Sequence, residues 1–132
     1  MPVMLDLELQ PKAEAAAYAR QAMENLGEDL DPEVLETVRL LVSELVSNSV
    51  RHGDLNASDR IRLQLAARDE RIRVEVTDPG DGFDPSPAED PPPDSPSGWG
   101  LYLVDRIADR WGVEGDGTTT VWFELARSGA LR

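Results

Sequence analysis

The amino-acid sequence predicts a single α/β domain in which helices pack against strands. Between Leu35 and Val46, apolar side chains recur every three or four residues, which places them on one face of a helix. In several shorter segments apolar and polar residues alternate, as they do in strands that bury one face. A chain of 132 residues has the usual size of one domain and can bury a core. We therefore expect residues 1–132 to form one domain.

The composition of the chain excludes several classes of protein. The absence of cysteine rules out disulfides and thiolate metal sites, and it is compatible with a reducing cytosol. No apolar run approaches the length of a membrane span and the first residues do not form a secretion signal, so we expect a cytoplasmic protein without a membrane partner. The formal net charge of −13 argues against direct binding of nucleic acid. It does not exclude ATP, because Mg²⁺ and backbone N–H groups can supply positive potential locally.

The chain is expected to begin with a strand and a helix. Apolar residues alternate with mostly polar ones at Val3, Leu5, Leu7 and Leu9, and Pro11 ends this pattern. An alanine-rich segment from Lys12 to Leu26 has high helix propensity, and Gly27 is a plausible residue to end it. One face of this helix is expected to hold Ala15, Tyr18, Ala22 and Leu26.

The next helix has a recognisable start, buried face and end. Asp31 is a good N-cap and Pro32 suits the first helical position. Arg51 and His52 fall in the last turn, where cations are favoured, and Gly53 suits the left-handed position that follows. The buried face is formed by Leu35, Val38, Leu41, Val42, Leu45 and Val46.

A polar group of side chains lies near the end of this helix. Glu44 and Asn48 are spaced i and i+4, with Ser47 and Arg51 beside them. On its own this pattern is typical of a solvated helix face. A functional interpretation depends on motifs further along the chain.

An antiparallel hairpin is expected after a polar connection over residues 54–59. Residues 61–66 and 71–76 alternate between apolar and polar, and Asp69-Glu70 lies between them. Asp78 continues the apolar face of the second strand, where a carboxylate is costly unless a structural donor or a ligand pairs with it. Gly80 and Gly82 follow, either as turn residues or as positions where the backbone can approach a ligand closely.

A proline-rich loop and a glycine pair come next. Residues 84–97 hold six of the ten prolines and four acidic residues, so we expect a mobile loop that serves as a lid or as an inert linker. The sequence Gly98-Trp99-Gly100-Leu101 then opens a helix that continues to Ile107. A glycine-rich loop that runs into a helix N-terminus can bind an anion, although it can also be a simple hinge.

The chain is expected to end with a second hairpin. Trp111 and Val113 precede a turn over residues 114–117, and Val121, Phe123 and Leu125 follow it. Thr119 shares the face of these last apolar residues, as Asp78 does in its own strand. Thr118 and Thr120 are the alternatives to Thr119 as an inward polar residue.

In combination, these motifs resemble the GHKL ATPase superfamily. The resemblance rests on Glu44-x-x-x-Asn48, Asp78-x-Gly80-x-Gly82, the proline-rich loop, Gly98-x-Gly100 and a late threonine, and it extends from about Val34 to Leu125. The runs Glu-Leu-Val-Ser-Asn-Ser-Val-Arg-His-Gly and Gly-Leu-Tyr-Leu-Val-Asp-Arg-Ile-Ala-Asp-Arg-Trp-Gly-Val are most similar to single-domain anti-sigma factor serine kinases of bacteria.

The resemblance implies a fold and a site. The fold would be a two-layer α/β sandwich, with about three helices on one face of a mixed, mainly antiparallel sheet, and residues 84–97 would be the ATP lid. Glu44 would act as the general base and Asn48 as the Mg²⁺ ligand. Asp78 would accept the adenine amino group, with Thr119 nearby. The ATP site would further include Arg51, Gly80, Gly82, Gly98, Trp99, Gly100 and Leu101.

Two features depart from the pattern of the family. Three consecutive threonines stand where one is usual, and the expected lid holds no Lys or Arg for the γ-phosphate. Arg51 and Arg106 are the alternatives for that contact. These departures concern the rate of catalysis more than the binding of ATP.

Three functions are consistent with the resemblance. The first is an ATP-dependent serine/threonine kinase that phosphorylates an anti-sigma factor antagonist of the STAS type and, in another partner state, sequesters a sigma factor. The second is an ATP-binding partner switch without significant kinase activity. The third is an orphan histidine kinase-type ATPase domain, which the lack of a dimerisation segment with a phosphoacceptor disfavours. The family also implies a homodimer.

Overall fold

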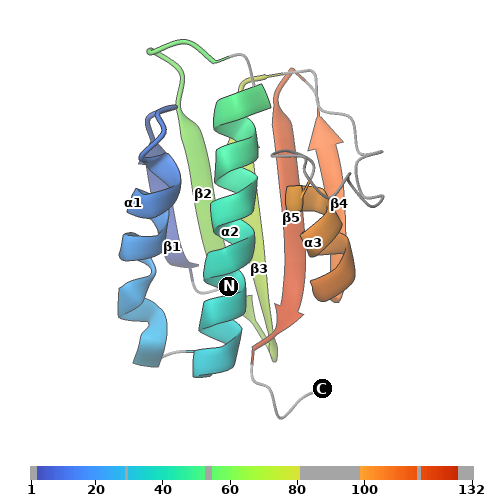
Figure 1. Ribbon diagram of the computed structural model, residues 1–132. Helices are drawn as coiled ribbons and strands as arrows, with labels where there is room; N and C mark the ends of the chain where they lie inside the picture. Colours follow the sequence, from blue (N-terminus) through green and yellow to red (C-terminus); the bar gives the residue numbers. More distant parts are fainter. Residues whose placement is uncertain (1–2, 29, 53–54, 81–98, 116, 128–132) are drawn as a thin grey trace.

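The computed structural model describes residues 3–28, 30–52, 55–80, 99–115 and 117–127. Five strands and three α-helices, with one short 3-10 helix, make up this part of the chain (Figure 1). In chain order they are β1 (Val3–Leu9), α1 (Ala15–Ala22), the 3-10 helix η1 (Glu24–Glu28), α2 (Pro32–His52), β2 (Ile61–Arg68), β3 (Arg71–Asp78), α3 (Trp99–Ile107), β4 (Arg110–Gly115) and β5 (Thr119–Ala126).

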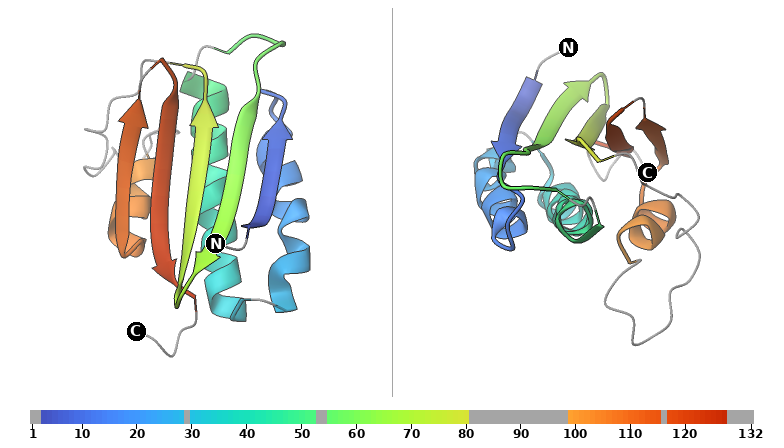
Figure 2. Two further views of the ribbon diagram at one scale, coloured as in Figure 1. Left: turned by 180° about the vertical axis from the view of Figure 1, so that it is seen from behind. Right: turned by 90° about the horizontal axis from the view of Figure 1, so that it is seen from above.

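The strands form one sheet that the helices cover on a single face. The strand order is β1-β2-β3-β5-β4, and each of the four pairings between described strands is antiparallel. Figure 2 shows α1, α2 and α3 on the same side of the sheet, while the opposite side is open. The predicted two-layer sandwich is confirmed, although the described strands include no parallel pair.

The core lies between the two layers and follows the alternation in the strands. In β3 and β5 every second side chain is buried, so that one face of each strand points to the helices. Phe123 lies at the centre of this arrangement and is fully buried. The helices and strands contribute the other fully buried large side chains, which include Leu41, Ile61, Leu63, Leu65, Ile72, Leu101 and Leu125.

The helical segment before α2 differs from the prediction. A single helix from Lys12 to Leu26 was expected, but α1 covers only Ala15–Ala22 and η1 follows it. Tyr18 was expected to share one face with Ala15 and Leu26, but it is 58% exposed, whereas those two residues are buried. The buried face is formed by Ala15, Ala16, Ala19, Met23 and Leu26.

Packing explains this break in the helix. A 3-10 turn superposes residues three apart, and this keeps Met23 and Leu26 together in the core after α1 has ended. Gly27 accordingly lies within η1 and does not act as the residue that ends a long helix. Tertiary burial has overridden the alanine-rich propensity of the segment.

Helix α2 agrees with its predicted start and end. The Asp31 Oδ1 atom accepts a hydrogen bond from the Glu33 backbone N–H at 3.2 Å, which satisfies one of the free donors of the first turn. The helix ends at His52, so Arg51 lies in its last turn, whereas Gly53 falls outside the described residues. None of the helices in the described ranges has the length and apolar character that crossing a membrane requires.

The open face of the sheet carries a network of charged and aromatic side chains. The Arg73 guanidinium lies 4.1 Å from the ring centre of Trp122 and donates hydrogen bonds to Glu75 and Glu124 at 3.0 and 3.2 Å. Burial opposes the charge of Arg73, but the two carboxylates outweigh it and raise the pKa of Arg73 above its ordinary value. Gly112 makes room for the Trp122 indole, since an added Cβ would lie 2.8 Å from it.

Candidate functional site

Polar residues from three elements meet at one end of the sheet. Asp78 is the last residue of β3, and it pairs in register with Thr119, the first residue of β5. The last turns of α2 pack over this end of β3, as Figure 1 shows at the top of the molecule. Both strands direct these two polar residues toward α2 because Asp78 and Thr119 share the parity of the core residues in their strands.

Asp78 is held by two hydrogen bonds from different parts of the chain. Its Oδ2 atom accepts a hydrogen bond from the Ser49 hydroxyl at 2.7 Å. Its Oδ1 atom accepts one from the Gly80 backbone N–H at 2.8 Å. Asp78 is only 6% exposed, so these donors offset much of the cost of burying its charge.

Thr119 extends this network through the backbone of Gly80. Its hydroxyl donates a hydrogen bond to the Gly80 carbonyl oxygen at 2.6 Å, and the residue is buried. Thr118 is exposed, and the Thr120 hydroxyl is hydrogen bonded to Thr77 at 2.8 Å on the open side of the sheet. Of the three consecutive threonines, Thr119 is therefore the one that lies beside Asp78.

Ser49 belongs to this cluster although the sequence analysis did not single it out. It is 9% exposed and follows Leu45 by four residues, so it continues the apolar stripe of α2 toward the core. A hydroxyl at the end of a buried stripe needs a partner. The inward Asp78 was a signal that could have led to Ser49, because each of the two buried polar groups requires the other.

Glu44 and Asn48 lie one turn apart on α2, next to this cluster. Glu44 is half-buried, whereas Asn48 is 7% exposed. The Asn48 side-chain oxygen accepts a long hydrogen bond of 3.4 Å from the Arg51 guanidinium, and Arg51 itself is exposed. The C-terminal half of α2 thus carries an acid, an amide and a cation near Ser49 in the sequence.

The glycine motifs are only partly visible. Gly80 belongs to the Asp78 network through both its N–H and its carbonyl group. Gly82, Gly98 and the expected lid over residues 84–97 lie outside the described residues. Trp99 and Gly100 are the first two residues of α3, as predicted, and the Leu101 side chain is buried in the core. The Leu101 side chain therefore contributes to core packing, which leaves only its backbone for a ligand.

The two arginines considered for phosphate binding lie in different surroundings. Arg51 lies beside Asn48, in the last turn of α2. Arg106 lies near the end of α3, where it is paired with Asp105 and stacks over Tyr102 at 4.6 Å from the ring centre. Arg106 thus has partners on its own helix, and Arg51 contacts Asn48, which is a predicted site residue.

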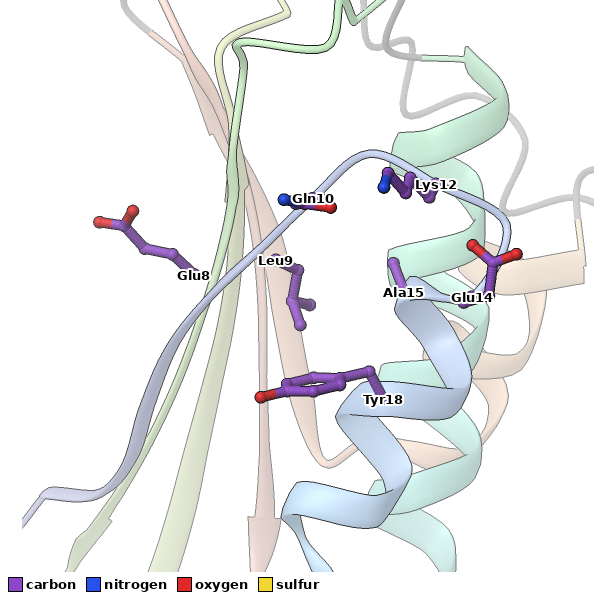
Figure 3. A pocket seen from close by; sticks show the side chains of 7 residues that line it. All are labelled: Glu8, Leu9, Gln10, Lys12, Glu14, Ala15 and Tyr18. Atoms are coloured by element: carbon purple, nitrogen blue, oxygen red, sulfur yellow. The ribbon is translucent and has the colours of Figure 1, made fainter.

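A separate hollow lies at the far edge of the sheet. It has a volume of about 320 Å³ and is situated between the end of β1 and the start of α1 (Figure 3). None of the residues predicted for ATP binding lines it, and β2 separates its strand from β3. The residues around it are Glu8, Leu9, Gln10, Lys12, Glu14, Ala15 and Tyr18. We place the candidate functional site at the Asp78 cluster because the buried polar side chains of the described residues, Asn48, Ser49, Asp78 and Thr119, lie there.

The residues present fit a magnesium nucleotide. Asp78 offers carboxylate lone pairs that suit an exocyclic amino group, and the Asn48 amide oxygen suits a hard cation. Within the described ranges, no group of three or more acidic, histidine or cysteine side chains is placed to hold a metal. Mg²⁺ is usually held by one or two protein oxygens and by the phosphates of its substrate.

Curated relatives of the chain include anti-sigma F factors of several bacteria. This chain is 31% identical over 121 residues to the anti-sigma F factor of Clostridium botulinum strain Eklund 17B, in an alignment that covers 85% of each protein. It is 30% identical over 129 residues to the anti-sigma F factor of Clostridium beijerinckii, with 89% of this chain and 90% of that protein covered.

Solved structures with a similar fold include domains of two histidine kinases. The catalytic domain of histidine kinase ThkA matches 98% of this chain over its whole length, with a TM-score of 0.62 and 13% identity. The histidine kinase domain of the Erythrobacter litoralis EL346 blue-light activated kinase matches 86% of this chain, which spans 59% of that domain, with a TM-score of 0.58 and 21% identity. The family model described as a histidine kinase-like ATPase domain matches residues 9–125. Because this match covers most of the chain, the chain belongs to the histidine kinase-like ATPase domain family.

Proposed function

We propose that this chain is a cytoplasmic ATP-dependent serine/threonine kinase that also acts as an anti-sigma factor. Its protein substrate would be a small anti-sigma factor antagonist of the STAS type, and in another partner state it would bind a sigma factor. The observation that carries this proposal is the convergence on the end of α2. Ser49 meets the buried Asp78 there, Asn48 directly precedes Ser49, and Glu44 lies one turn before Asn48.

Asp78 would select the base of the nucleotide. Both of its oxygens already accept hydrogen bonds, and each has a further lone pair for a ligand. An acceptor at this position pairs with the amino group of adenine. Thr119 supports the arrangement by holding the Gly80 carbonyl, and this fixes the turn that donates to Asp78.

Asn48 would hold Mg²⁺ together with the phosphates, and the ion would neutralise part of the charge on the triphosphate. This neutralisation matters because the protein has a formal net charge of −13. Arg51 contacts the Asn48 amide and adds a fixed cation at the same place. The remaining glycines of the site, Gly82, Gly98 and Gly100, would let the backbone approach the phosphates.

Glu44 would act as the general base. In the transfer step a serine or threonine hydroxyl oxygen of the antagonist forms a bond to the γ-phosphorus, and the bond from that phosphorus to the β,γ-bridging oxygen breaks. ADP leaves with the electron pair of the broken bond, and the hydroxyl proton moves to the Glu44 carboxylate. The position of Glu44, one turn from Asn48 on the same side of α2, suits this role.

The proposed partners follow from the relatives. The name anti-sigma F factor describes proteins that align with most of this chain, and we extend the activity to it on that basis. The strongly acidic composition supports a protein partner over nucleic acid. As in the family it resembles, we propose one domain over residues 1–132 that forms a homodimer.

The second candidate function is a partner switch that binds ATP without transferring phosphate. The absence of Lys and Arg from residues 84–97 favours it, because the proposed lid would bring no cation to the γ-phosphate.

Phosphotransfer to candidate antagonists from the same genome tests the proposal. The purified full chain is incubated with γ-labelled ATP, Mg²⁺ and each antagonist, and labelled protein is quantified. Glu44→Gln should bind ATP normally but transfer phosphate about 10²–10⁴ times more slowly, as is usual for loss of a general base. Asn48→Ala should weaken both binding and transfer. Glu36→Gln is the matched control, since it removes an exposed carboxylate two turns earlier on the same helix.

The possible results separate the two functions. Transfer by Glu44→Gln at the parent rate would refute the role of Glu44 as base. ATP binding without transfer by the parent protein, to every antagonist tested, would favour the partner switch. No binding of ATP by the parent would refute both functions.

A further inference from the structure

The hydrogen bond between Ser49 and Asp78 has no part in the transfer step described above. It joins two buried side chains across the two layers of the fold, one from α2 and one from the end of β3. We propose that Ser49 is a positioning residue that makes the Asp78 site selective for a 6-amino purine over a 6-oxo purine. This inference rests on the proposed function, in which Asp78 receives the base of ATP.

The first step of the argument concerns the orientation of the carboxyl group. Ser49 holds Oδ2 from α2, and the Gly80 N–H holds Oδ1 from the turn after β3. Because the two donors come from separate elements, together they fix the rotation of the carboxyl plane. With Ser49 removed, only the Gly80 contact would restrain the group, and Oδ2 would be left buried without its protein donor.

The second step concerns where the hydroxyl protons point. The Ser49 proton is directed at the Asp78 carboxylate, which has no proton to offer in return. The Thr119 proton is directed at the Gly80 carbonyl oxygen, which only accepts hydrogen bonds. Both hydroxyl groups therefore donate their protons to acceptors of the protein itself.

The consequence is that the side chains of Ser49, Asp78 and Thr119, among the described residues, offer a ligand acceptors and no donor. The side chains of Ser49, Asp78 and Thr119 can each still accept a hydrogen bond, but none has a proton left to donate. The 6-amino group of adenine satisfies such a surface. The 6-oxo group of hypoxanthine or guanine would face oxygen atoms without a proton between them, and unpaired buried polar groups give strong discrimination.

Calorimetry with three nucleotides tests the role of Ser49. The full-length parent protein and its variants are titrated with the Mg²⁺ complexes of ATP, of purine riboside triphosphate, which lacks the 6-amino group, and of inosine triphosphate, which carries a 6-oxo group. Ser49→Ala should bind ATP about tenfold more weakly, the scale of one hydrogen bond to a charged group. Its affinity for purine riboside triphosphate should be unchanged, because that ligand has no amino group to place.

Two further variants complete the design. Ser49→Thr keeps the hydroxyl and should therefore keep the preference of the parent protein for ATP over inosine triphosphate. Ser43→Ala is the matched control, since Ser43 lies on the same helix and its hydroxyl accepts a hydrogen bond from Arg20 and not from the site. Thermal unfolding without nucleotide checks that each variant is folded. If Ser49→Ala does not fold, Ser49→Cys replaces it, because a thiol fills the same space and is a weaker donor.

Each result has a definite meaning. A loss of affinity in Ser49→Ala that is equal for ATP and purine riboside triphosphate would show a merely structural role and overturn the inference. Unchanged or tighter ATP binding would overturn it as well, while leaving the proposed function intact. Failure of the parent protein to bind any of the three nucleotides would overturn the proposed function itself, and the inference with it.

Discussion

Replacement of Asp78 by asparagine is the most informative single change at the site. The two side chains have the same shape, so the effect on packing should be small. The Gly80 N–H lies 2.8 Å from one carboxylate oxygen and requires an acceptor there. In Asp78→Asn the amide oxygen must occupy that position, and the amide nitrogen must then face Ser49.

The fold can accommodate this exchange. The Ser49 hydroxyl can rotate and accept a hydrogen bond from the new amide nitrogen, so both protein contacts of the residue survive. Folding stability should consequently change by only about 1 kcal/mol, the worth of one ordinary hydrogen bond. At the ligand, however, the second proton of the amide nitrogen would point toward the adenine amino group.

The expected loss of ATP affinity follows from this reversal. A hydrogen bond to a charged acceptor contributes about 1.5–3 kcal/mol, so Asp78→Asn should weaken ATP binding by roughly 10- to 100-fold. The same variant should bind inosine triphosphate better relative to ATP, because its amide proton can be donated to a 6-oxo group. Calorimetry with both nucleotides measures the two effects in one series.

A matched control measures how much the loss of one negative charge alone changes ATP affinity. Glu75→Gln also takes one negative charge from β3, but Glu75 lies on the open face of the sheet, where it is hydrogen bonded to Arg73. Equal ATP affinity in the parent protein, Asp78→Asn and Glu75→Gln would refute the assignment of Asp78 to the base of the nucleotide. A preference for ATP over inosine triphosphate that persists in Asp78→Asn would refute the reasoning about donors and acceptors.

Two further predictions concern β5. Thr119→Val should weaken ATP binding because it removes the hydrogen bond to Gly80, whereas Thr120→Val, which loses only its bond to Thr77 on the open face, should bind ATP as the parent does; calorimetry that ranks the two variants equally would contradict this. Phe123→Ala should lower the free energy of unfolding by about 3–5 kcal/mol, since Phe123 is fully buried, and urea denaturation that gives a loss below about 1 kcal/mol would show that the core is placed wrongly.

Much of the site could be predicted because alternation in a strand assigns each residue to a face. Asp78 shares the parity of Ile72, Val74 and Val76, and this alone predicts that its carboxyl group points into the core. The same reasoning selected Thr119 from three adjacent threonines, and the structure places it opposite Asp78. The capped start and the cationic end of α2 were also readable, because both depend on local chemistry.

The features that could not be predicted depend on contacts between residues that are far apart in the sequence. Alternation shows which face of a strand is buried, but it does not show that β3 pairs with β5 and leaves β4 at the edge. The early end of α1 is set by the burial of Met23 and Leu26 against the core, which helix propensity does not describe. Ser49 was missed for a related reason, because a single serine has meaning only once the inward Asp78 is known to lie beside it.

The register of β5 links the core to the site. Val121, Phe123 and Leu125 are buried and have the same parity as Thr119, so they fix the face on which Thr119 lies. A shift of β5 by one residue would turn these apolar side chains to solvent. It would also place Thr118 or Thr120 on the inner face of the sheet. Because such a shift would cost the burial of several large side chains, the position of Thr119 beside Asp78 is as well fixed as the core itself. On the side of β5, the burial of the core therefore also holds the hydrogen-bonded cluster around Asp78 in place. The contacts made by Ser49 and by the turn at Gly80 are not fixed in this way.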